Sequence, residues 1–226
     1  MRVFILGGTG LVGTRLVRRL RDRGDSVAVL TRRPEVARAK LAPGCVIVEG
    51  DPMQPGAWSA AVKDADAVIN LVGEPVLGKR WNQSLKALLR NSRVQSTANA
   101  VKALALAPLT QAGQPKVLLN ASAIGYYGPH ANEELTEAAP PGDDELARLT
   151  VDWEAAAREA EPLGVRVALL RIGVVLDPDG GALALMLPPF KLGLGGPIGS
   201  GRQWLSWIHH RDVVGILLLA LDRDEA

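Results

Sequence analysis

Three glycines at a fixed spacing directly follow the first apolar run of this chain. Residues 3–6 are apolar over the length of a buried strand, and residues 7–13 read Gly-Gly-Thr-Gly-Leu-Val-Gly. Apolar residues then recur at helical spacing as far as Gly24, so the glycines stand between a strand and a helix. A second apolar run covers residues 26–30. This order predicts a βαβ unit whose first turn carries the G-x-x-G-x-x-G pattern of dinucleotide-binding folds.

Each glycine of this turn has a physical task in such a fold. The first permits the tight bend, the second lets the backbone approach a pyrophosphate, and the third lets the helix pack closely on the strand. The free N–H groups and the positive end of the helix would then hold the phosphates. The predicted phosphate-binding residues are Gly7, Thr9, Gly10, Leu11, Val12 and Gly13.

The residues that end the second strand predict which dinucleotide binds. An acidic residue at this position would hold the 2′-hydroxyl of the adenosine ribose, but the chain reads Thr31-Arg32-Arg33. A guanidinium can bind the additional 2′-phosphate of NADP, which a carboxylate would repel. We therefore predict NADP as the cofactor and Arg32 as its main contact, with Arg33 and Arg15 as weaker candidates. A solvent-facing arginine after a strand is the alternative interpretation.

Two further segments are predicted to border the same cofactor. Asp51 follows the third strand, residues 46–48, and is a candidate hydrogen-bond partner of the adenine. Leu71, Val72 and Gly73 follow the fourth strand and are expected against the adenosine half of the cofactor. A glycine at position 73 suits close approach of the backbone, although a simple turn glycine would look the same.

Strands and helices alternate along most of the chain. Further strands are predicted at residues 67–71, 116–120 and 166–172, and helices at 58–62, 83–107 and 145–160. This alternation predicts an α/β fold: a Rossmann-type doubly wound parallel sheet with helices on both faces. We assign residues 1–176 to this cofactor-binding domain.

The local amino-acid composition changes after residue 176. Prolines and glycines cluster at 177–181 and 193–201 around an apolar segment, 182–192. We predict that residues 177–226 form the loops of a small, incomplete C-terminal substrate lobe and a returning helix, within the same compact unit. Asp212 is the expected N-cap of that helix.

Composition limits the partners and the compartment. The net charge of +2 and the helical spacing of the arginine clusters argue against a nucleic-acid surface. The chain has a single cysteine, Cys45, and no apolar run of about 18 residues, so we predict a cytoplasmic protein without membrane contact. Its three isolated histidines predict no metal site. A small-molecule substrate is the expected partner, and the oligomeric state stays open.

Several short stretches together resemble the extended short-chain dehydrogenase/reductase superfamily, and within it an atypical epimerase-like branch that contains SDR family 39U. The similarity covers the whole chain. Its specific stretches are residues 7–13, 70–74, 80–82, 91–93, 122–128, 153–154, 192–201 and 207–209, with Asp212. In the wider superfamily a Tyr hydroxyl is the acid and base, a Lys assists it, a Ser orients the substrate oxygen, and an Asn carries a water relay. The resemblance implies these roles only where the residues match.

Most of this catalytic set is missing here. Ser122 matches the serine, but the positions of the Tyr-x-x-x-Lys pair are occupied by Leu149 and Trp153. Where the asparagine would stand, the chain reads Ser-Arg-Val-Gln-Ser-Thr at 92–97. A leucine cannot transfer a proton, and a tryptophan carries no charge. The sequence thus separates cofactor binding, which it supports, from catalysis.

Two hypotheses follow from the missing pair. In the first, catalysis continues: Tyr126 or Tyr127 supplies the proton near Ser122, and Arg93 brings positive charge to the cofactor. In the second, the protein is a non-catalytic NADP-binding regulator or scaffold, for example in cell division. Tyr127 also matches a residue that shapes the substrate pocket in the superfamily. The resemblance further implies that Val175 contacts the nicotinamide and that Arg171 faces the pocket.

The leading interpretation is an NADP-binding epimerase or oxidoreductase with a non-standard active site. Its substrate would be a small polar molecule such as a nucleotide sugar. The predicted catalytic residues are Ser122, Tyr126 and Tyr127.

Overall fold

A single six-stranded parallel sheet organises the computed structural model, which describes residues 1–76, 78, 80–197 and 199–223. The strand order is β3-β2-β1-β4-β5-β6. The strands are β1 (Arg2–Leu6), β2 (Ser26–Thr31), β3 (Val46–Glu49), β4 (Ala67–Asn70), β5 (Val117–Ala123) and β6 (Arg166–Ile172). The order reverses between β1 and β4, which creates the crevice where open α/β sheets bind their ligands. The predicted fold class is confirmed.

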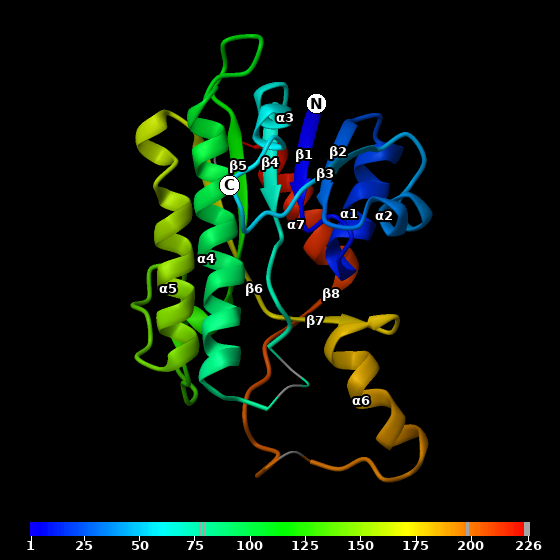
Figure 1. Ribbon diagram of the computed structural model, residues 1–226. Helices are drawn as coiled ribbons and strands as arrows, with labels where there is room; N and C mark the ends of the chain where they lie inside the picture. The colour runs from blue at the N-terminus through cyan, green and yellow to red at the C-terminus, as the bar shows by residue number, and fades with distance from the viewer. Residues whose placement is uncertain (77, 79, 198, 224–226) are drawn as a thin grey trace.

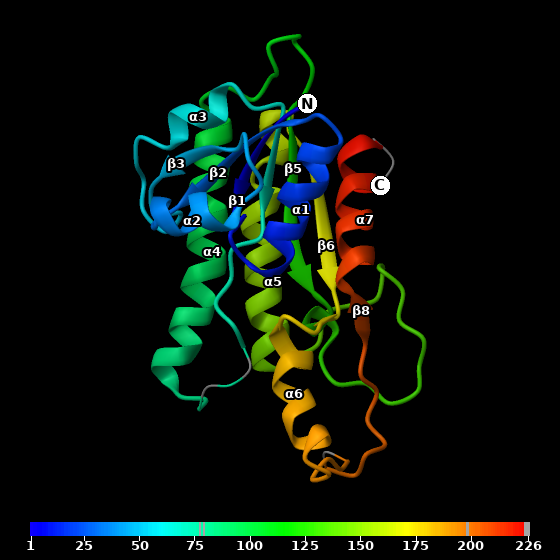
Figure 2. The same ribbon diagram turned by 90° about the vertical axis from the view of Figure 1, so that its right-hand side faces the viewer.

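Helices cover both faces of this sheet (Figures 1 and 2). On one face lie α1 (Leu11–Asp22), α2 (Pro34–Lys40) and α7 (His210–Asp222); on the other lie α3 (Ser59–Lys63), α4 (Gln83–Ala105) and α5 (Glu145–Arg158). Alternate residues of each strand feed the two cores. Ile5 packs in the core that includes Leu16 and Leu217, and Phe4 packs in the core that includes Leu104 and Ala157. Near-continuous apolar strands are what a sheet buried on both faces requires.

A smaller substructure leaves the sheet after β6. Strands β7 (Val174–Asp177) and β8 (Trp207–His209) pair in parallel, and α6 (Gly181–Lys191) lies between them in sequence. Figures 1 and 2 show α6 projecting below the carboxyl ends of the main strands. The predicted lobe segment, 177–226, contains α6, β8 and the returning helix α7, whose apolar side lies in the α1 core, whereas β7 begins three residues before it. Residue 198 of its second glycine cluster and residues 224–226 lie outside the described part.

Three helical details differ from the sequence expectations. The segment expected as loop around residues 182–192 forms α6, although it contains Pro188 and Pro189. Helix α2 was not predicted, because Val36 is its one large apolar side chain and leaves no amphipathic repeat to read. Helix α7 begins at His210 with His209 as its N-cap, so the prediction of Asp212 as N-cap was wrong. Two short 3₁₀ turns, Ile124–Tyr127 and Glu161–Leu163, complete the described helices.

None of the helices in the described ranges has both the length and the apolarity needed to span a lipid bilayer. Helix α4 is 23 residues long, but polar side chains occur along it.

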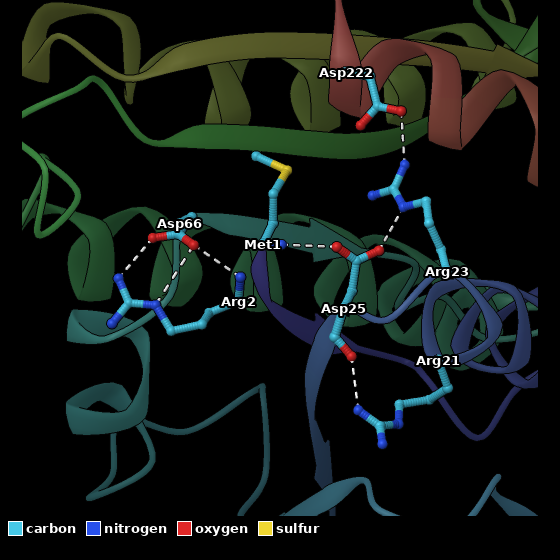
Figure 3. A network of polar contacts seen from close by, with 7 residues as sticks. All are labelled: Met1, Arg2, Arg21, Arg23, Asp25, Asp66 and Asp222. Atoms are coloured by element: carbon cyan, nitrogen blue, oxygen red, sulfur yellow. Dashed lines mark hydrogen bonds and ion pairs between the residues drawn. The ribbon is translucent and has the colours of Figure 1, made fainter.

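A polar network connects the N-terminus to the end of α7 (Figure 3). The Met1 ammonium donates to Asp25 Oδ1 over 2.8 Å, and Arg23 Nε donates to Asp25 Oδ2 over 2.5 Å. Arg23 Nη1 also donates to Asp222 Oδ2 over 2.6 Å. This network joins β1, the end of α1 and the end of α7, three segments that are far apart along the chain.

Candidate functional site

The glycine turn after β1 has the geometry that its sequence predicts. Gly7 has a φ of +81°, a conformation that side chains rarely adopt, and the Gly10 N–H donates to the Gly7 carbonyl over 3.0 Å. A Cβ at Gly7 would lie 2.8 Å from the carbonyl carbon of Leu71. A Cβ at Gly13 would lie 2.7 Å from the Cα of Gly8. These contacts explain why the turn needs glycine at its first and third motif positions.

Helix α1 starts immediately after this turn. Gly10 is its N-cap and has an extended conformation, and Leu11 and Val12 form its first turn with Gly13. The first N–H groups of a helix have no partner within the helix, so they are free to bind an anion. Lys40 Nζ donates to the Thr9 carbonyl over 2.7 Å and brings a cation beside the turn. Sequence reasoning missed Lys40, because it did not recognise α2.

A groove of about 210 Å³ lies at the carboxyl ends of β1, β2 and β4. It brings together most of the predicted cofactor residues from four separate segments of the chain. Its described lining consists of Gly7, Thr9, Gly10, Leu30, Thr31, Arg32, Arg33, Asp51, Pro52, Met53, Leu71, Val72, Gly73, Glu74 and Ser92. Val175 lies instead in β7, where it packs against the α1 core.

At one end of the groove Thr31 orders the turn that presents the arginines. The Thr31 hydroxyl is buried and accepts from the Arg33 N–H over 3.1 Å. The Arg32 side chain is exposed and makes no hydrogen bond or ion pair within the described residues. Arg15 differs: it donates to Asp177 over 2.6 Å and to Asp179 over 2.9 Å. Among the predicted arginines, Arg32 and Arg33 line the groove.

A buried amide holds the turn after β4. Asn70 donates through Nδ2 to Asn120 Oδ1 over 2.7 Å and to Thr97 Oγ1 over 2.8 Å. Its Oδ1 accepts from the Val72 N–H over 3.2 Å, which positions the backbone that lines the groove. Sequence reasoning gave Asn70 no role. The available indication was a polar residue at the end of a fully buried strand.

Arg93 supports the same turn from behind. Its guanidinium donates to the Glu74 carbonyl over 3.1 Å and lies so close to Gly73 that a Cβ there would be 3.0 Å from Cζ. The guanidinium also lies 5.2 Å from the ring centre of Trp153. Burial lowers the pKa of Arg93, and Glu74 acts in the opposite direction. Arg93 is therefore a half-buried cation behind the groove wall and does not face open solvent.

The predicted catalytic residues are joined through two residues that had no assigned chemistry. Ser122 Oγ donates to Glu154 Oε1 over 2.5 Å, and both residues are buried. Arg171 donates to the two Glu154 oxygens over 2.8 and 2.9 Å and to the Tyr127 hydroxyl oxygen over 2.9 Å. Its Cζ lies 3.5 Å from the ring centre of Tyr126. Burial acts to raise the pKa of Glu154, but Arg171 and Ser122 outweigh it, so the pKa is lowered.

A second cavity, of about 630 Å³, lies along β6 and α7. Tyr127 and Arg171 line it, together with apolar residues that include Ile172, Ile208 and Ile216. The network from Ser122 to Tyr127 thus runs from β5 across α5 and β6 to the wall of this cavity.

These features define a Rossmann-type dinucleotide-binding protein: a doubly wound parallel sheet with a glycine turn and a groove at its switch point. The chain belongs to the NAD dependent epimerase/dehydratase family, whose model matches residues 3–226.

Related sequences and solved structures agree with this assignment. The epimerase family protein SDR39U1 homolog of Arabidopsis thaliana, described as chloroplastic, is 42% identical over 98% of this chain and 62% of its own length. A crystal structure of human SDR39U1 with NADPH superposes on this chain with a TM-score of 0.83. The two sequences are 37% identical, and the match covers 100% of this chain and 72% of the human one. A nucleoside-diphosphate sugar epimerase from Corynebacterium glutamicum is 33% identical, with a TM-score of 0.80, over 44% of its chain. The chain therefore spans less than two thirds of the plant relative.

Proposed function

We propose that this chain binds NADP(H) in the groove between Arg32 and the glycine turn. The main support for this proposal is Arg32, which lines the groove and whose guanidinium is unpaired within the described residues. An unpaired guanidinium suits the 2′-phosphate, which distinguishes NADP from NAD. The NADPH in the human relative supports the same choice.

Different residues of the groove would bind different parts of the cofactor. The turn from Gly7 to Gly13 and the start of α1 would hold the pyrophosphate, with Lys40 adding positive charge at Thr9. Asp51 and the segment from Leu71 to Gly73 would border the adenosine half. Val175 would contact the nicotinamide, as the family resemblance implies.

We further propose an NADP-dependent oxidoreductase or epimerase acting on a small polar substrate such as a nucleotide sugar. When bound, the nicotinamide supplies or takes a hydride. Ser122, Tyr126 and Tyr127 would then position the reacting carbon's oxygen and move its proton. The family assignment and the sugar epimerase among the relatives support this class of chemistry.

A second candidate function is a non-catalytic NADP-binding regulator. Its supporting observation is Trp153, which stands in place of the lysine and is buried with its Nε1 donating to Thr97 over 3.0 Å. Leu149, in place of the tyrosine, contributes no proton. The two candidates share the cofactor groove and differ in whether a hydride is transferred.

A fluorescence titration of the protein with NADPH and with NADH tests the cofactor. We expect NADPH to bind more tightly, because the 2′-phosphate adds a charge-assisted hydrogen bond. Equal affinities would contradict the role of Arg32. Oxidation of NADPH in the presence of a panel of nucleotide sugars and small carbonyl compounds then separates the enzyme from the regulator.

The proposed setting is a reducing compartment such as the cytoplasm. Cys45 is an unpaired thiol, and burial raises its pKa, which disfavours the reactive thiolate. The proposed partner is the small-molecule substrate.

A further inference from the structure

Arg171 stands beside Tyr127 as a lysine stands beside the tyrosine in the pair that this chain lacks. Its Nη1 donates to the Tyr127 hydroxyl oxygen over 2.9 Å. A guanidinium that donates to a phenol oxygen stabilises the negative charge left there when the phenol gives up its proton. The same guanidinium lies over the ring of Tyr126. The chain has only these two tyrosines, and Arg171 contacts both.

Glu154 determines where the Arg171 guanidinium lies. It accepts two parallel hydrogen bonds from Arg171, an arrangement that fixes the plane of the guanidinium as well as its distance. Arg171 Nη1 also donates to the Glu137 carbonyl over 2.9 Å. Rotating the guanidinium away from Tyr127 would therefore break several charge-assisted bonds at once.

Glu154 also determines which hydrogen bonds Ser122 can offer. An ionised carboxylate only accepts, so the single hydroxyl proton of Ser122 is used by Glu154. Ser122 is left with lone pairs alone. Tyr127 has the opposite polarity: its oxygen accepts from Arg171, and its own proton has no acceptor within the described residues and can be donated.

We propose that Tyr127 and Arg171 replace the missing tyrosine–lysine pair, and that Glu154 is the positioning residue that holds Arg171 in place and makes Ser122 an acceptor. This inference rests on the proposed oxidoreductase function. It also defines the substrate by chemistry: an oxygen that accepts a proton at Tyr127, and a hydroxyl or N–H group that donates at Ser122. A hydroxy-carbonyl compound has both groups.

The proton balance of the step follows from this arrangement. When a substrate carbonyl is reduced with NADPH as the hydride donor, the hydride adds to the carbonyl carbon and the carbon–oxygen π pair moves to the oxygen. The Tyr127 O–H bond breaks, and its proton forms the new O–H bond of the product alcohol. Arg171 stabilises the phenolate until it takes a proton from water. Oxidation of the alcohol is the same step in reverse.

Carbon-13 NMR of protein labelled at tyrosine Cζ tests the pair without a substrate. Two signals are expected, assigned with Tyr126→Phe and Tyr127→Phe. Arg171→Gln and Glu154→Gln should each move the Tyr127 signal toward that of N-acetyltyrosinamide in the same buffer. Arg158→Gln is the matched control, because Arg158 lines the same cavity but donates to Glu161 and not to Glu154 or Tyr127. Its charge acts on Glu154 only at a distance. Guanidinium chloride added to Arg171→Gly should restore the signal.

The outcomes separate the parts of this proposal. If Arg171→Gln leaves the Tyr127 signal unchanged, the proposed Tyr127–Arg171 pair is overturned. If Arg171→Gln moves the signal and Glu154→Gln does not, the positioning role of Glu154 is overturned. If either glutamine variant unfolds, Arg171→Lys or Glu154→Asp replaces it in the same measurement, because each keeps the charge and changes the hydrogen-bond geometry. Circular dichroism checks the fold of each.

Adding NADP⁺ links the pair to the proposed function. We expect it to shift the Tyr127 signal in the wild type and in Arg158→Gln. If NADPH binds by fluorescence but the Tyr127 signal does not respond to NADP⁺, this inference fails and the cofactor site stands. If NADPH does not bind, the proposed function fails, while the Tyr127–Arg171 contact is still measured in the unliganded protein.

Discussion

Arg15 on α1 donates to the fully buried carboxylate of Asp177 on β7 over 2.6 Å, across 162 positions of sequence. This bond fastens the strand that leads to α6 onto the helix that begins at the glycine turn. Close packing reinforces it: a Cβ at Gly180 would lie 2.9 Å from the Leu11 side chain. An ion pair and close packing thus hold the start of the lobe against the proposed pyrophosphate helix.

Arg15→Gln should destabilise the protein by about 2 kcal/mol, below the usual range for a fully buried pair because Arg15 is partly exposed. The reason is that Asp177 would remain buried without its main partner. Urea denaturation measures the change. Arg18→Gln, on the exposed side of the same helix, is the control and should leave the midpoint unchanged. Equal stabilities for the two variants would contradict the importance of this pair.

The Met1–Asp25–Arg23 network predicts a pH dependence (Figure 3). Burial acts to raise the pKa of Asp25, but hydrogen bonds from Arg23 and the N-terminal ammonium outweigh it, and the pKa is lowered. A lowered pKa stabilises the fold above the unfolded value of about 3.9, and this stabilisation disappears as the pH falls through the folded value.

Asp25→Asn should therefore be less stable than the wild type at pH 7, and the difference should shrink in acid. Thermal denaturation between neutral and acidic pH measures it. Asp22→Asn, at the exposed end of α1, should follow the wild-type curve. A difference between wild type and Asp25→Asn that grew on acidification would refute the assigned sign.

Two glycine substitutions should have opposite effects. At Gly13 a new Cβ would meet the backbone of Gly8, so Gly13→Ala should distort the turn and abolish NADPH binding. At Gly215, inside α7, a Cβ would meet nothing within 4 Å. Gly215→Ala should stabilise the fold by about 0.5–1 kcal/mol, the usual gain in a helix interior. Calorimetry measures the stability of both variants, and fluorescence titration measures their NADPH binding. If Gly13→Ala still binds NADPH, the close approach of Gly13 to Gly8 is not needed for the cofactor site.

Arg32→Gln should weaken NADPH binding by roughly tenfold and leave NADH binding unchanged. The expected reason is the loss of a charge-assisted bond to the 2′-phosphate alone. Arg38→Gln is a suitable control, because Arg38 is a nearby exposed arginine whose guanidinium pairs with Glu35. If Arg32→Gln weakens both cofactors equally, Arg32 contributes general charge and not specificity.

Returning a lysine to position 153 should not recreate the superfamily's pair. Trp153 is 5% exposed and packs against the Arg93 guanidinium, so Trp153→Lys would bury a second cation there. We expect the free energy of unfolding to fall by about 3 kcal/mol or more, as when other buried aromatic side chains are removed. Trp153→Phe should retain most of the stability in chemical denaturation. A stable Trp153→Lys protein would indicate that this position still tolerates the charge.

The sequence alone determined the features that depend on local pattern. The glycine turn, the alternation of strands and helices and the arginines after β2 are short-range patterns, since each is set by a few neighbouring residues and by helix or strand periodicity. These patterns predicted the doubly wound sheet and most of the groove lining. They did not predict α2, whose one large apolar side chain, Val36, shows no helical period.

Only the tertiary structure decided which distant side chains meet. Glu154 bonds Ser122 from 32 positions away and Arg171 from 17, and Lys40 reaches Thr9 across 31. Arg15 was a candidate for the 2′-phosphate in the sequence, and the fold directs it to Asp177 instead. Such bonds depend on how strands and helices pack, and a charged residue looks the same in a sequence whether its partner is a cofactor, a carboxylate or water.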